Sequence, residues 1–493
     1  MSKKVIYYDL SRLLNRSVAS HATGIDRVDI RYAMYFLEDK ESEFNGLIQI
    51  AGFYFVVEIG IVALFLNALF DKWMGNGCID FNFEKFKRAQ YDYGKKGAQG
   101  SYESINVELL NIFERNRTCN CLYFNCSHYG IADNIKVIQT MKVLGRIKFC
   151  YYLHDIIPIE FPEYVRDGDD LIHFDRVKVM LTYGDIIYVN SNYTRKQLQN
   201  FCNRYSFEPP FVVVTRIGVE DCFLQKEICK PRFLDKKILS KYFVYVSTIE
   251  PRKNHLLLLN VWRQIVEDVV DPPYLVLVGH RGWNNQIVFD MLDRALALKE
   301  YVIELNDIAD ADLVSLIKNA KAMLFPSFSE GWGMPLVESA ALQVPVICSD
   351  IDVFHEAGQN MMKYINSIDG GQWKKTLIQF GDCTEERELI VRSLVTFDVP
   401  TWQDHFEQVE KGISCLEYHY SEAKVTNLSV LDDFKNHLRQ MPKASGNAKV
   451  NVLRSLELYE IKIAKFLQHV EFKQPKCKII FDLLRKVYWS FKN

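Results

Sequence analysis

Apolar runs alternate with amphipathic stretches along most of this chain. KKVIYYDLS predicts a first strand, and ATGIDRVDIRYAMYFLED has the spacing of a helix that follows a glycine turn. RIKFCYYLHD, GDIIYVNSNYTRKQLQNF and PPFVVVTRIGVED continue the pattern, with a Ser/Asn helix cap inside the second of them. Repeated strand–helix units predict an α/β fold with mostly parallel, doubly wound sheets.

The pattern is interrupted and then restarts. Residues 226–240, KEICKPRFLDKKILS, carry a run of charge and predict a linker. After it, KYFVYVSTIEPRKNH, YLVLVGHRGW, YVIELNDI, AKAMLFPSFSEG and VPVICSD predict a second set of strands. We therefore expect two Rossmann-like domains, 1–225 and 241–414, facing each other across a cleft, followed by a helical, partly basic extension over 415–493.

Two segments suggest a membrane. Residues 47–70 have transmembrane length, but they include Gln49, Glu58 and Asn67. FYFVVEI is typical of a strand and GIVALFLNALF of a helix, so a buried strand–helix pair is the preferred interpretation. Residues 473–493 combine six Lys/Arg with apolar and aromatic residues. That pattern fits either a membrane-surface helix or a helix docked on the protein.

Composition narrows the function. A net charge of −2 over 493 residues argues against a whole-chain nucleic-acid binder. The 12 cysteines do not form a spaced framework, and the N-terminal residues do not resemble a signal peptide, so we expect reduced thiols in the cytoplasm. Cys119, Cys121 and Cys126 lack a partner pair at zinc-finger spacing, and CLYFNC is better explained as a buried strand.

The stretch SEGWGMPLVESAALQVPVI, residues 329–347, holds the first candidate chemistry. A glycine turn with Pro335 behind it predicts a helix N-terminus, which binds anions. A phosphate there would face the amides of Gly331 to Met334. Glu330 and Glu338 would flank it and bind hydroxyls, which suggests a nucleotide-sugar site. The alternative is an ordinary helix start with acidic residues.

STIEPRKNH, residues 247–255, follows a strand and carries Arg252 and Lys253 side by side. Both suit a diphosphate, and both would stabilise the charge that develops on a departing diphosphate. The alternative for this stretch is a basic loop in water.

Together these motifs carry a resemblance. EPRKNH, VGHRGW, LNDIADADL and PSFSEGWGMPLVESAALQVPVI, in that order, resemble the retaining glycosyltransferases of the GT-B fold, family 4 or group 1. TGIDRV, LHDIIPIEFPEY, VNSNYTR and RIGVED are similar to a bacterial subset that builds O-antigens, lipopolysaccharide and capsules. The resemblance covers residues 5–413. It departs at Gln343, where the family usually has glycine.

The resemblance implies a role for each motif. Arg252 and Lys253 would bind the donor diphosphate, with Glu330 on the donor sugar and Glu338 on the ribose. His154 would lie beside the transferred sugar, although a structural histidine at a strand end is the alternative. The remaining donor contacts implied by the resemblance are Gly24, Asn306, Ile308, Gly331, Trp332, Gly333 and Met334.

The implied reaction moves a hexose or deoxyhexose from a nucleoside diphosphate sugar to a hydroxyl of a growing, lipid-linked or polysaccharide glycan. The resemblance implies an α-linkage made with retention by front-face attack, without cofactor or required metal, and favours mannosyl or rhamnosyl donors. It also implies a cytoplasmic enzyme, whose basic tail suits contact with the inner membrane. A non-catalytic GT-B scaffold and a sugar-nucleotide epimerase are the alternatives. A phosphorylase lacks a convincing pyridoxal-phosphate lysine.

Overall fold

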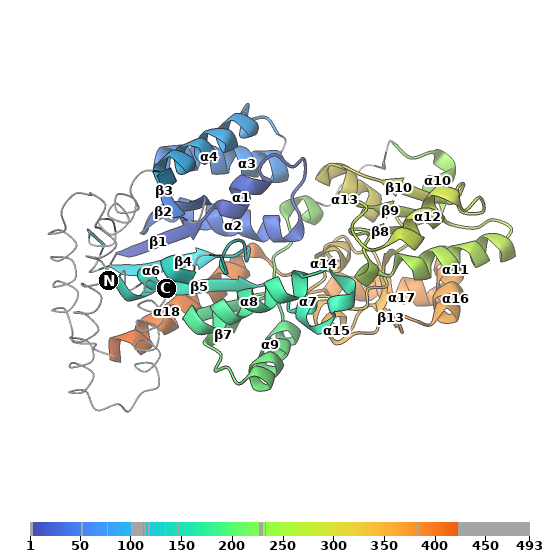
Figure 1. Ribbon diagram of the computed structural model, residues 1–493. Helices are drawn as coiled ribbons and strands as arrows, with labels where there is room; N and C mark the ends of the chain where they lie inside the picture. The colour runs from blue at the N-terminus through green and yellow to red at the C-terminus, as the bar shows by residue number, and fades with distance from the viewer. Residues whose placement is uncertain are drawn as a thin grey trace. The chain divides into compact units, whose positions relative to one another are not determined.

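The computed structural model describes residues 3–422 apart from 51–52, 76, 100–111, 113–114, 117–118, 134, 145–146, 226–229, 232 and 383. Residues 1–418 form one compact unit. It contains two β-sheets, each flanked by helices (Figure 1). The predicted extension over 415–493 lies outside the described residues except for its start, which belongs to a helix ending at Glu422.

The first sheet has the strand order β3-β2-β1-β4-β5-β6-β7. Its strands are β1 (Lys4–Asp9), β2 (Ser42–Ile50), β3 (Phe53–Val57), β4 (Asn120–Asn125), β5 (Lys148–Leu153), β6 (Ile186–Val189) and β7 (Phe211–Val214). Neighbours pair in parallel, except that β3 pairs antiparallel with β2. β1, β4, β5 and β6 are almost entirely buried, as parallel strands covered on both faces are, and this gives their apolar runs.

The second sheet has the order β10-β9-β8-β11-β12-β13, with parallel pairing between its strands. Its strands are β8 (Tyr242–Val246), β9 (Tyr274–Val278), β10 (Val302–Leu305), β11 (Met323–Phe325), β12 (Val346–Ser349) and β13 (Lys363–Ile365). The short strand β13 has no counterpart among the predicted strands. Two Rossmann-like sheets of this kind form a GT-B fold. We call them, with their helices, the first and second domains.

Helices fill most of the connections. In the first half of the chain they are α1 (Ser11–Arg16), α2 (Gly24–Glu38), α3 (Ile59–Met74), α4 (Phe83–Gln99), α6 (Ile135–Leu144), α7 (Ile157–Glu160), α8 (Asp169–Tyr183) and α9 (Asn192–Tyr205), with 3₁₀ turns η1 (Pro162–Tyr164) and η2 (Asp221–Leu224). In the second half they are α10 (Lys236–Ser240), η3 (Pro251–Lys253), α11 (His255–Asp268), α12 (Gln286–Arg294), α13 (Asp310–Lys318), α14 (Met334–Ala341), α15 (Asp352–Ala357), α16 (Gly370–Gly381), α17 (Glu385–Ser393), η4 (Leu394–Thr396) and α18 (Trp402–Glu422). The segment predicted as a linker therefore contains the short helix α10.

The apolar segment over residues 47–70 is a strand, a second strand and a helix, namely the end of β2, β3 and most of α3. Leu47 and Leu66 of this segment are fully buried. For the described residues the strand and the helix of the preferred interpretation are confirmed, but the helix is buried on one side only, since Leu64 is 68% exposed. Among the described residues, no helix has the length and apolar character needed to cross a membrane.

Helix α18 returns to the first domain, although it follows the second domain in sequence. The Tyr188 hydroxyl of β6 donates to the carbonyl of Val409 in α18 (3.0 Å). The rings of Tyr35 and Phe406 stack with centroids 3.9 Å apart. An amphipathic pattern predicts this helix, but the pattern does not reveal which sheet the helix covers.

Gln343 occupies a position that favours glycine. It follows α14 with a φ of +58°, in the left-handed region, and its side chain is exposed. The amide of Val344 donates to the carbonyl of Ser339 (3.0 Å), as expected where a helix ends through a left-handed residue. Departure from the glycine of the family therefore introduces local backbone strain rather than a change in the site.

We expect Gln343→Gly to raise the free energy of unfolding by about 0.5–1 kcal/mol, because glycine adopts this φ without steric cost. Urea unfolding measures the change. Gln343→Ala is the matched control and should give no such gain, since alanine keeps the Cβ. Equal stability of the glycine and alanine variants would contradict the strain argument.

Candidate active site

The cationic motif and the glycine turn meet because their strands are neighbours. β8 and β11 pair in parallel, so the segments that leave their carboxyl ends lie at one edge of the second sheet. The amide of Phe328, after β11, donates to the carbonyl of Arg252 in η3 (2.9 Å). This hydrogen bond fastens the two segments together and brings Glu330 next to the two cations.

Glu330 forms ion pairs with both predicted cations. Its Oε1 lies 2.5 Å from Lys253 Nζ, and its Oε2 lies 2.7 Å from Arg252 Nη1. Arg252 also donates through Nη2 to Glu250 Oε1 (2.8 Å) and through Nη1 to the carbonyl of Ser329 (2.7 Å). The structure thus gathers Arg252, Lys253 and Glu330 in one cluster and adds Glu250, which the sequence analysis did not identify as a site residue.

The cluster fixes the charge of Glu330. Burial alone would raise the pKa of its carboxyl, but Arg252 and Lys253 overcome that effect and lower the pKa to about 2. Burial and the neighbouring Arg252 lower the pKa of Lys253, while Glu330 opposes them. The two carboxylates and two cations balance, so a diphosphate that enters must take a cation from a carboxylate that already holds it.

Two helix N-termini face each other beside this cluster. Gly333, with a φ of +102°, precedes α14, which begins at Met334. Gly24 is the first residue of α2, and a Cβ on it would lie 3.2 Å from Met334 Sδ. Both helices direct the positive ends of their dipoles here, as an anion site requires. Trp332 is buried in the hydrophobic core, so its predicted donor contact concerns its backbone amide.

Glu338 is the fifth residue of α14 and is buried. Burial raises the pKa of its carboxyl to about 7; the charge of Arg27 opposes this and that of Asp310 adds to it. Arg27 of α2 forms a two-pronged ion pair with Asp310, the first residue of α13, through contacts of 2.6 and 2.9 Å. This pair links the two domains close to Glu338.

His154 follows β5 at the edge of the first sheet. Its Nε2 lies 2.8 Å from the carbonyl of Cys126. A carbonyl only accepts, so Nε2 carries the hydrogen and Nδ1 is left as an acceptor. Burial lowers the pKa of the imidazole to about 4, which keeps the ring neutral at physiological pH. Such a ring can accept a hydrogen bond from a sugar hydroxyl, but it is a weak proton acceptor for catalysis.

For the sugar transfer that the resemblance implies, the pH dependence of the rate should therefore contain no inflection from His154 between pH 6 and 8. We expect His154→Gln to lower kcat by about 10-fold, from the loss of one oriented hydrogen bond, with the shape of the profile unchanged. Rate measurements across this range check both statements. An inflection near pH 6.5 that disappears in the variant would contradict them.

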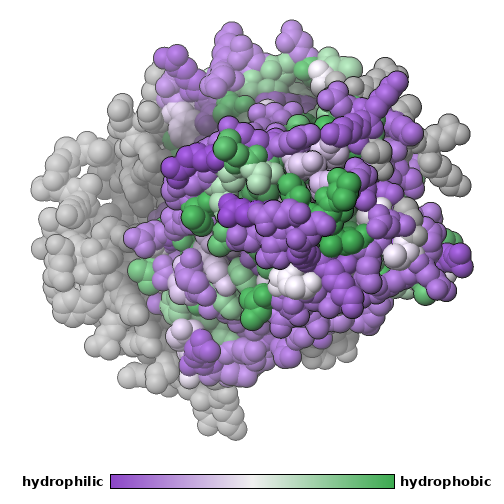
Figure 2. Space-filling view, turned by 90° about the vertical axis from the view of Figure 1, so that its right-hand side faces the viewer, coloured by the Kyte–Doolittle hydropathy of each residue, from purple (hydrophilic) through white to green (hydrophobic). Residues whose placement is uncertain are grey.

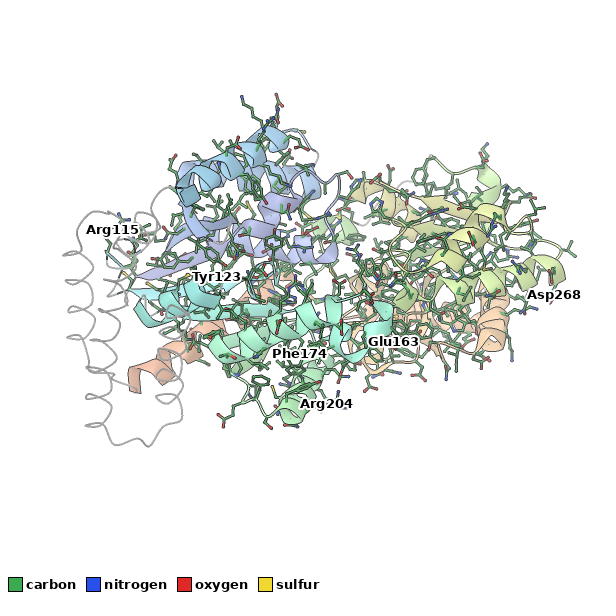
Figure 3. The ribbon with its side chains drawn as sticks, viewed as in Figure 1. Arg115, Tyr123, Glu163, Phe174, Arg204 and Asp268 are labelled. Carbon is green, nitrogen blue, oxygen red and sulfur yellow. The ribbon has the colours of Figure 1, made fainter. Side chains whose placement is uncertain are left out.

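The residues predicted near the nucleotide follow β10, which is separated from β8 in the sheet by β9. Asn306 and Ile308 follow β10, and Asp307 between them has a φ of +54°. Its Oδ1 accepts a hydrogen bond from the Ser20 hydroxyl of the first domain (3.1 Å). In the GHRGW segment after β9, Trp283 Nε1 donates to the carbonyl of Tyr164 (3.0 Å). Figure 3 labels Glu163, the neighbour of Tyr164, in this region where the domains meet.

A groove of about 880 Å³ lies elsewhere, between α2, α18 and Phe70 of α3. None of the predicted site residues lines it, and we assign it no part in the donor chemistry. The face of the molecule turned to the viewer in Figure 2 is mostly hydrophilic, with apolar side chains in separate patches.

Comparison with known proteins finds a family similarity for part of the chain. Residues 231–361 match the family model described as glycosyl transferases group 1. The matched segment, which lies mostly in the second domain, is similar to the group 1 glycosyl transferases. The match contains the cation cluster, the glycine turn and α14, and it ends before α16, α17 and α18.

Mannosyltransferases are among the relatives of this chain. The chain is 28% identical over 209 residues to O-antigen chain mannosyltransferase B of Escherichia coli, covering 40% of this chain and 52% of that protein. It is 30% identical over 155 residues to O-antigen chain mannosyltransferase RfbU of Salmonella typhimurium, covering 31% of this chain and 42% of that protein. The chain thus spans about half the length of these relatives.

Solved structures support the fold. The crystal structure of Anabaena HepE in complex with UDP-glucose aligns over 84% of this chain and 99% of its own, with a TM-score of 0.53 and 13% identity. Sucrose-phosphate synthase from Thermosynechococcus elongatus aligns over 85% of this chain and 100% of its own, with a TM-score of 0.52 and 11% identity.

Sequence reasoning missed the residues that hold the motifs in place. Glu250 lies inside the quoted motif STIEPRKNH. Two adjacent buried cations need two carboxylates to balance them, and this requirement is a signal that could have identified Glu250. Arg27 and Asp310 also lie in quoted stretches, on opposite domains. Their pairing depends on how the domains pack, and no local pattern gives it.

Proposed function

We propose that this protein is a retaining, family 4 glycosyltransferase. It moves a mannosyl or rhamnosyl residue from a nucleoside diphosphate sugar to a hydroxyl of a growing surface glycan, such as an O-antigen, and forms an α-linkage. The observation that carries the proposal is the cluster in which Glu330 holds Arg252 and Lys253 beside the N-terminus of α14. The mannosyltransferase relatives support the choice of sugar.

In the proposed mechanism the donor exchanges partners with Glu330. The diphosphate takes Lys253, shares Arg252 with Glu330 and binds the backbone amides of residues 331–334, because cationic side chains and helix N-termini bind phosphate. Glu330 keeps Arg252 and turns its released oxygen to a hydroxyl of the donor sugar. Negative charge grows on the diphosphate as the glycosidic bond breaks, and the fixed cations stabilise that change.

The acceptor hydroxyl attacks from the same face as the departing diphosphate, whose oxygen takes the hydroxyl proton. His154 is neutral, so in this proposal it orients the sugar through Nδ1 instead of removing the proton. Arg252 and Lys253 supply positive charge at the diphosphate, and the mechanism assigns no step to a metal or a cofactor. Glu338 accepts hydrogen bonds from the ribose, while residues 306–308 lie along the nucleotide.

The acceptor is proposed to be a polysaccharide or lipid-linked glycan, reached in the cytoplasm. The described cysteines are free thiols, which fits a reducing compartment. We also propose contact with the inner membrane through residues 473–493. This segment lies outside the described residues, so the contact stays a prediction.

A panel of UDP-, GDP-, dTDP- and CMP-sugars tests the function. A ligand that binds the native state raises the melting temperature of the protein. We expect the sugars of one nucleotide class to raise the melting temperature of the wild type. When a glycan acceptor is added, a donor of that class should transfer its sugar to the acceptor. Failure of all the sugars to bind would overturn the proposal and favour a non-catalytic scaffold. Conversion of the donor sugar without an acceptor would favour an epimerase.

A further inference from the structure

The loop that joins β11 to α14 contacts the first domain through the carbonyl of Gly331 and through the ring of Phe328, which stacks on that of Tyr164 with centroids 5.4 Å apart. Gly331 O accepts a hydrogen bond from the Ser191 hydroxyl (2.9 Å). The Thr194 hydroxyl lies between two acceptors, 2.9 Å from Asn190 Oδ1 and 3.2 Å from the same Gly331 oxygen. Ser191 caps α9 and Thr194 lies in its first turn, and both are buried. Two hydroxyls from one domain thus converge on one carbonyl of the other.

The opposite side of Gly331 is equally close to the first domain. A Cβ there would lie 2.3 Å from the carbonyl oxygen of His154 and 3.1 Å from Asp155 Cβ. Asn190 Nδ2 donates to that same His154 oxygen (2.7 Å). Only glycine lets the loop reach the segment after β5, so residue 331 marks the point of tightest approach between the two domains.

Glu356 of α15 makes a second bridge to the same helix. Its carboxylate accepts hydrogen bonds from the amides of Asn192 (2.7 Å) and Tyr193 (3.0 Å), and from Asn192 Nδ2 (2.9 Å). A carboxylate from the second domain therefore caps the first turn of α9, where the helix dipole favours negative charge. Two segments of the second domain, the loop at Gly331 and helix α15, therefore form hydrogen bonds with the N-terminus of α9.

We propose that Ser191 and Thr194 are positioning residues that shape the phosphate-binding loop only when the domains are closed. In a trans peptide the C=O and the following N–H point in opposite directions. Holding the Gly331 carbonyl toward α9 therefore turns the Trp332 N–H away from α9. Domain closure therefore sets the orientation of the Trp332 amide, which donates a hydrogen bond to the donor diphosphate in the proposed function. The identity of the ligand in this inference rests on the proposed function. The contact between α9 and the loop does not depend on that function.

The simpler explanation is that these hydroxyls only cap α9. Ser191 does so, because its hydroxyl accepts from the amide of Thr194 (2.9 Å). Thr194→Val tests this explanation, since it keeps the size and the Ser191 cap and removes the hydroxyl that contacts both Gly331 O and Asn190 Oδ1. Thr182→Val is the control for the loss of a threonine hydroxyl: this exposed hydroxyl donates to the carbonyl of Lys178 in its own helix (2.7 Å), without touching the loop.

The test uses the full chain with the donor identified by the nucleotide panel. We expect Thr194→Val to raise the donor KM about 5- to 10-fold and to change kcat less, because the variant loses one hydrogen bond. Thr194→Ser should restore the KM, and Thr182→Val should match the wild type. Gly331→Ala, which forces the loop off His154, should lower kcat/KM about 100-fold. Equal KM values for Thr194→Val and Thr182→Val would overturn the proposal.

Hydrogen exchange of the peptide over residues 326–341, without donor, separates this inference from the function. We expect faster exchange in Thr194→Val than in Thr182→Val or Thr194→Ser. If the wild type binds no nucleotide sugar but this difference is seen, the function fails and the hold on the loop stands. If exchange is the same in all variants, the hold is refuted even in an active enzyme.

Discussion

Lys253→Ala should lower sugar transfer by about 10²–10³-fold, which is the effect of removing one oriented charge from a developing anion. The protein should stay folded, because Glu330 keeps its ion pair with Arg252 at 2.7 Å. Initial-rate measurements with a donor and a glycan acceptor, together with a melting curve, check both parts. The loss should appear mainly in kcat, since the charge on the diphosphate is larger in the transition state than in the ground state.

Lys237→Ala is a suitable control for the loss of a lysine. Lys237 forms an ion pair with Glu300 (3.2 Å), and both side chains are about two-thirds exposed. Transfer by this variant should equal that of the wild type. Retention of full activity by Lys253→Ala would contradict the assignment of the diphosphate to this cluster. Loss of activity in both variants would point to a general effect of positive charge.

The strand ends that carry the candidate chemistry could be predicted because the signal is local. β5, β8 and β11 are short apolar runs, and each is followed by polar residues that break the run. Parallel strands present such ends at one edge of a sheet. The positions of His154, Arg252 and Glu330 follow from this rule without knowledge of any contact between them.

The partners of these residues could not be predicted, since they depend on contacts between distant segments. Glu250 and Glu330 share Arg252, and Glu330 is 78 residues further along the chain than Arg252 by sequence number. The capping of α9 by Glu356 requires the two domains to meet. Periodicity describes which face of an element is apolar, but it carries no information about which element covers that face.

Strained positions are a further limit. Glycine is absent at 343, and the sequence alone suggested a departure from the family with no structural reason. The φ of +58° gives the reason, because it places the residue in the left-handed region. Asn254, with a φ of +56°, shows how a non-glycine residue is accommodated: its side chain donates to the carbonyl of Ser367 (2.8 Å).

Glu338→Gln should raise stability at pH 8 while weakening donor binding. Burial raises the pKa of this carboxyl to about 7 from its usual 4.5. The protonated form therefore stabilises the folded state fully below pH 4.5, and this contribution is lost as the pH rises through 7. Above pH 7 the wild type holds a buried carboxylate, and glutamine removes that charge. We expect a gain on the order of 1–3 kcal/mol at pH 8 that shrinks toward pH 5.

Donor affinity should change in the opposite direction. An ionised Glu338 accepts hydrogen bonds from both ribose hydroxyls, so wild-type affinity should rise between pH 6 and 8, whereas the glutamine variant should bind more weakly and show no rise. Urea unfolding at pH 5 and 8, with calorimetric titration of the donor, measures both effects. Glu330→Gln is the matched control of opposite sign: with a pKa of about 2, Glu330 is ionised throughout, and its loss should destabilise the protein at both pH values. If Glu338→Gln instead destabilises the protein at pH 8, the Glu338 carboxylate already has stabilising partners within the folded protein. That result would contradict its assignment to the ribose.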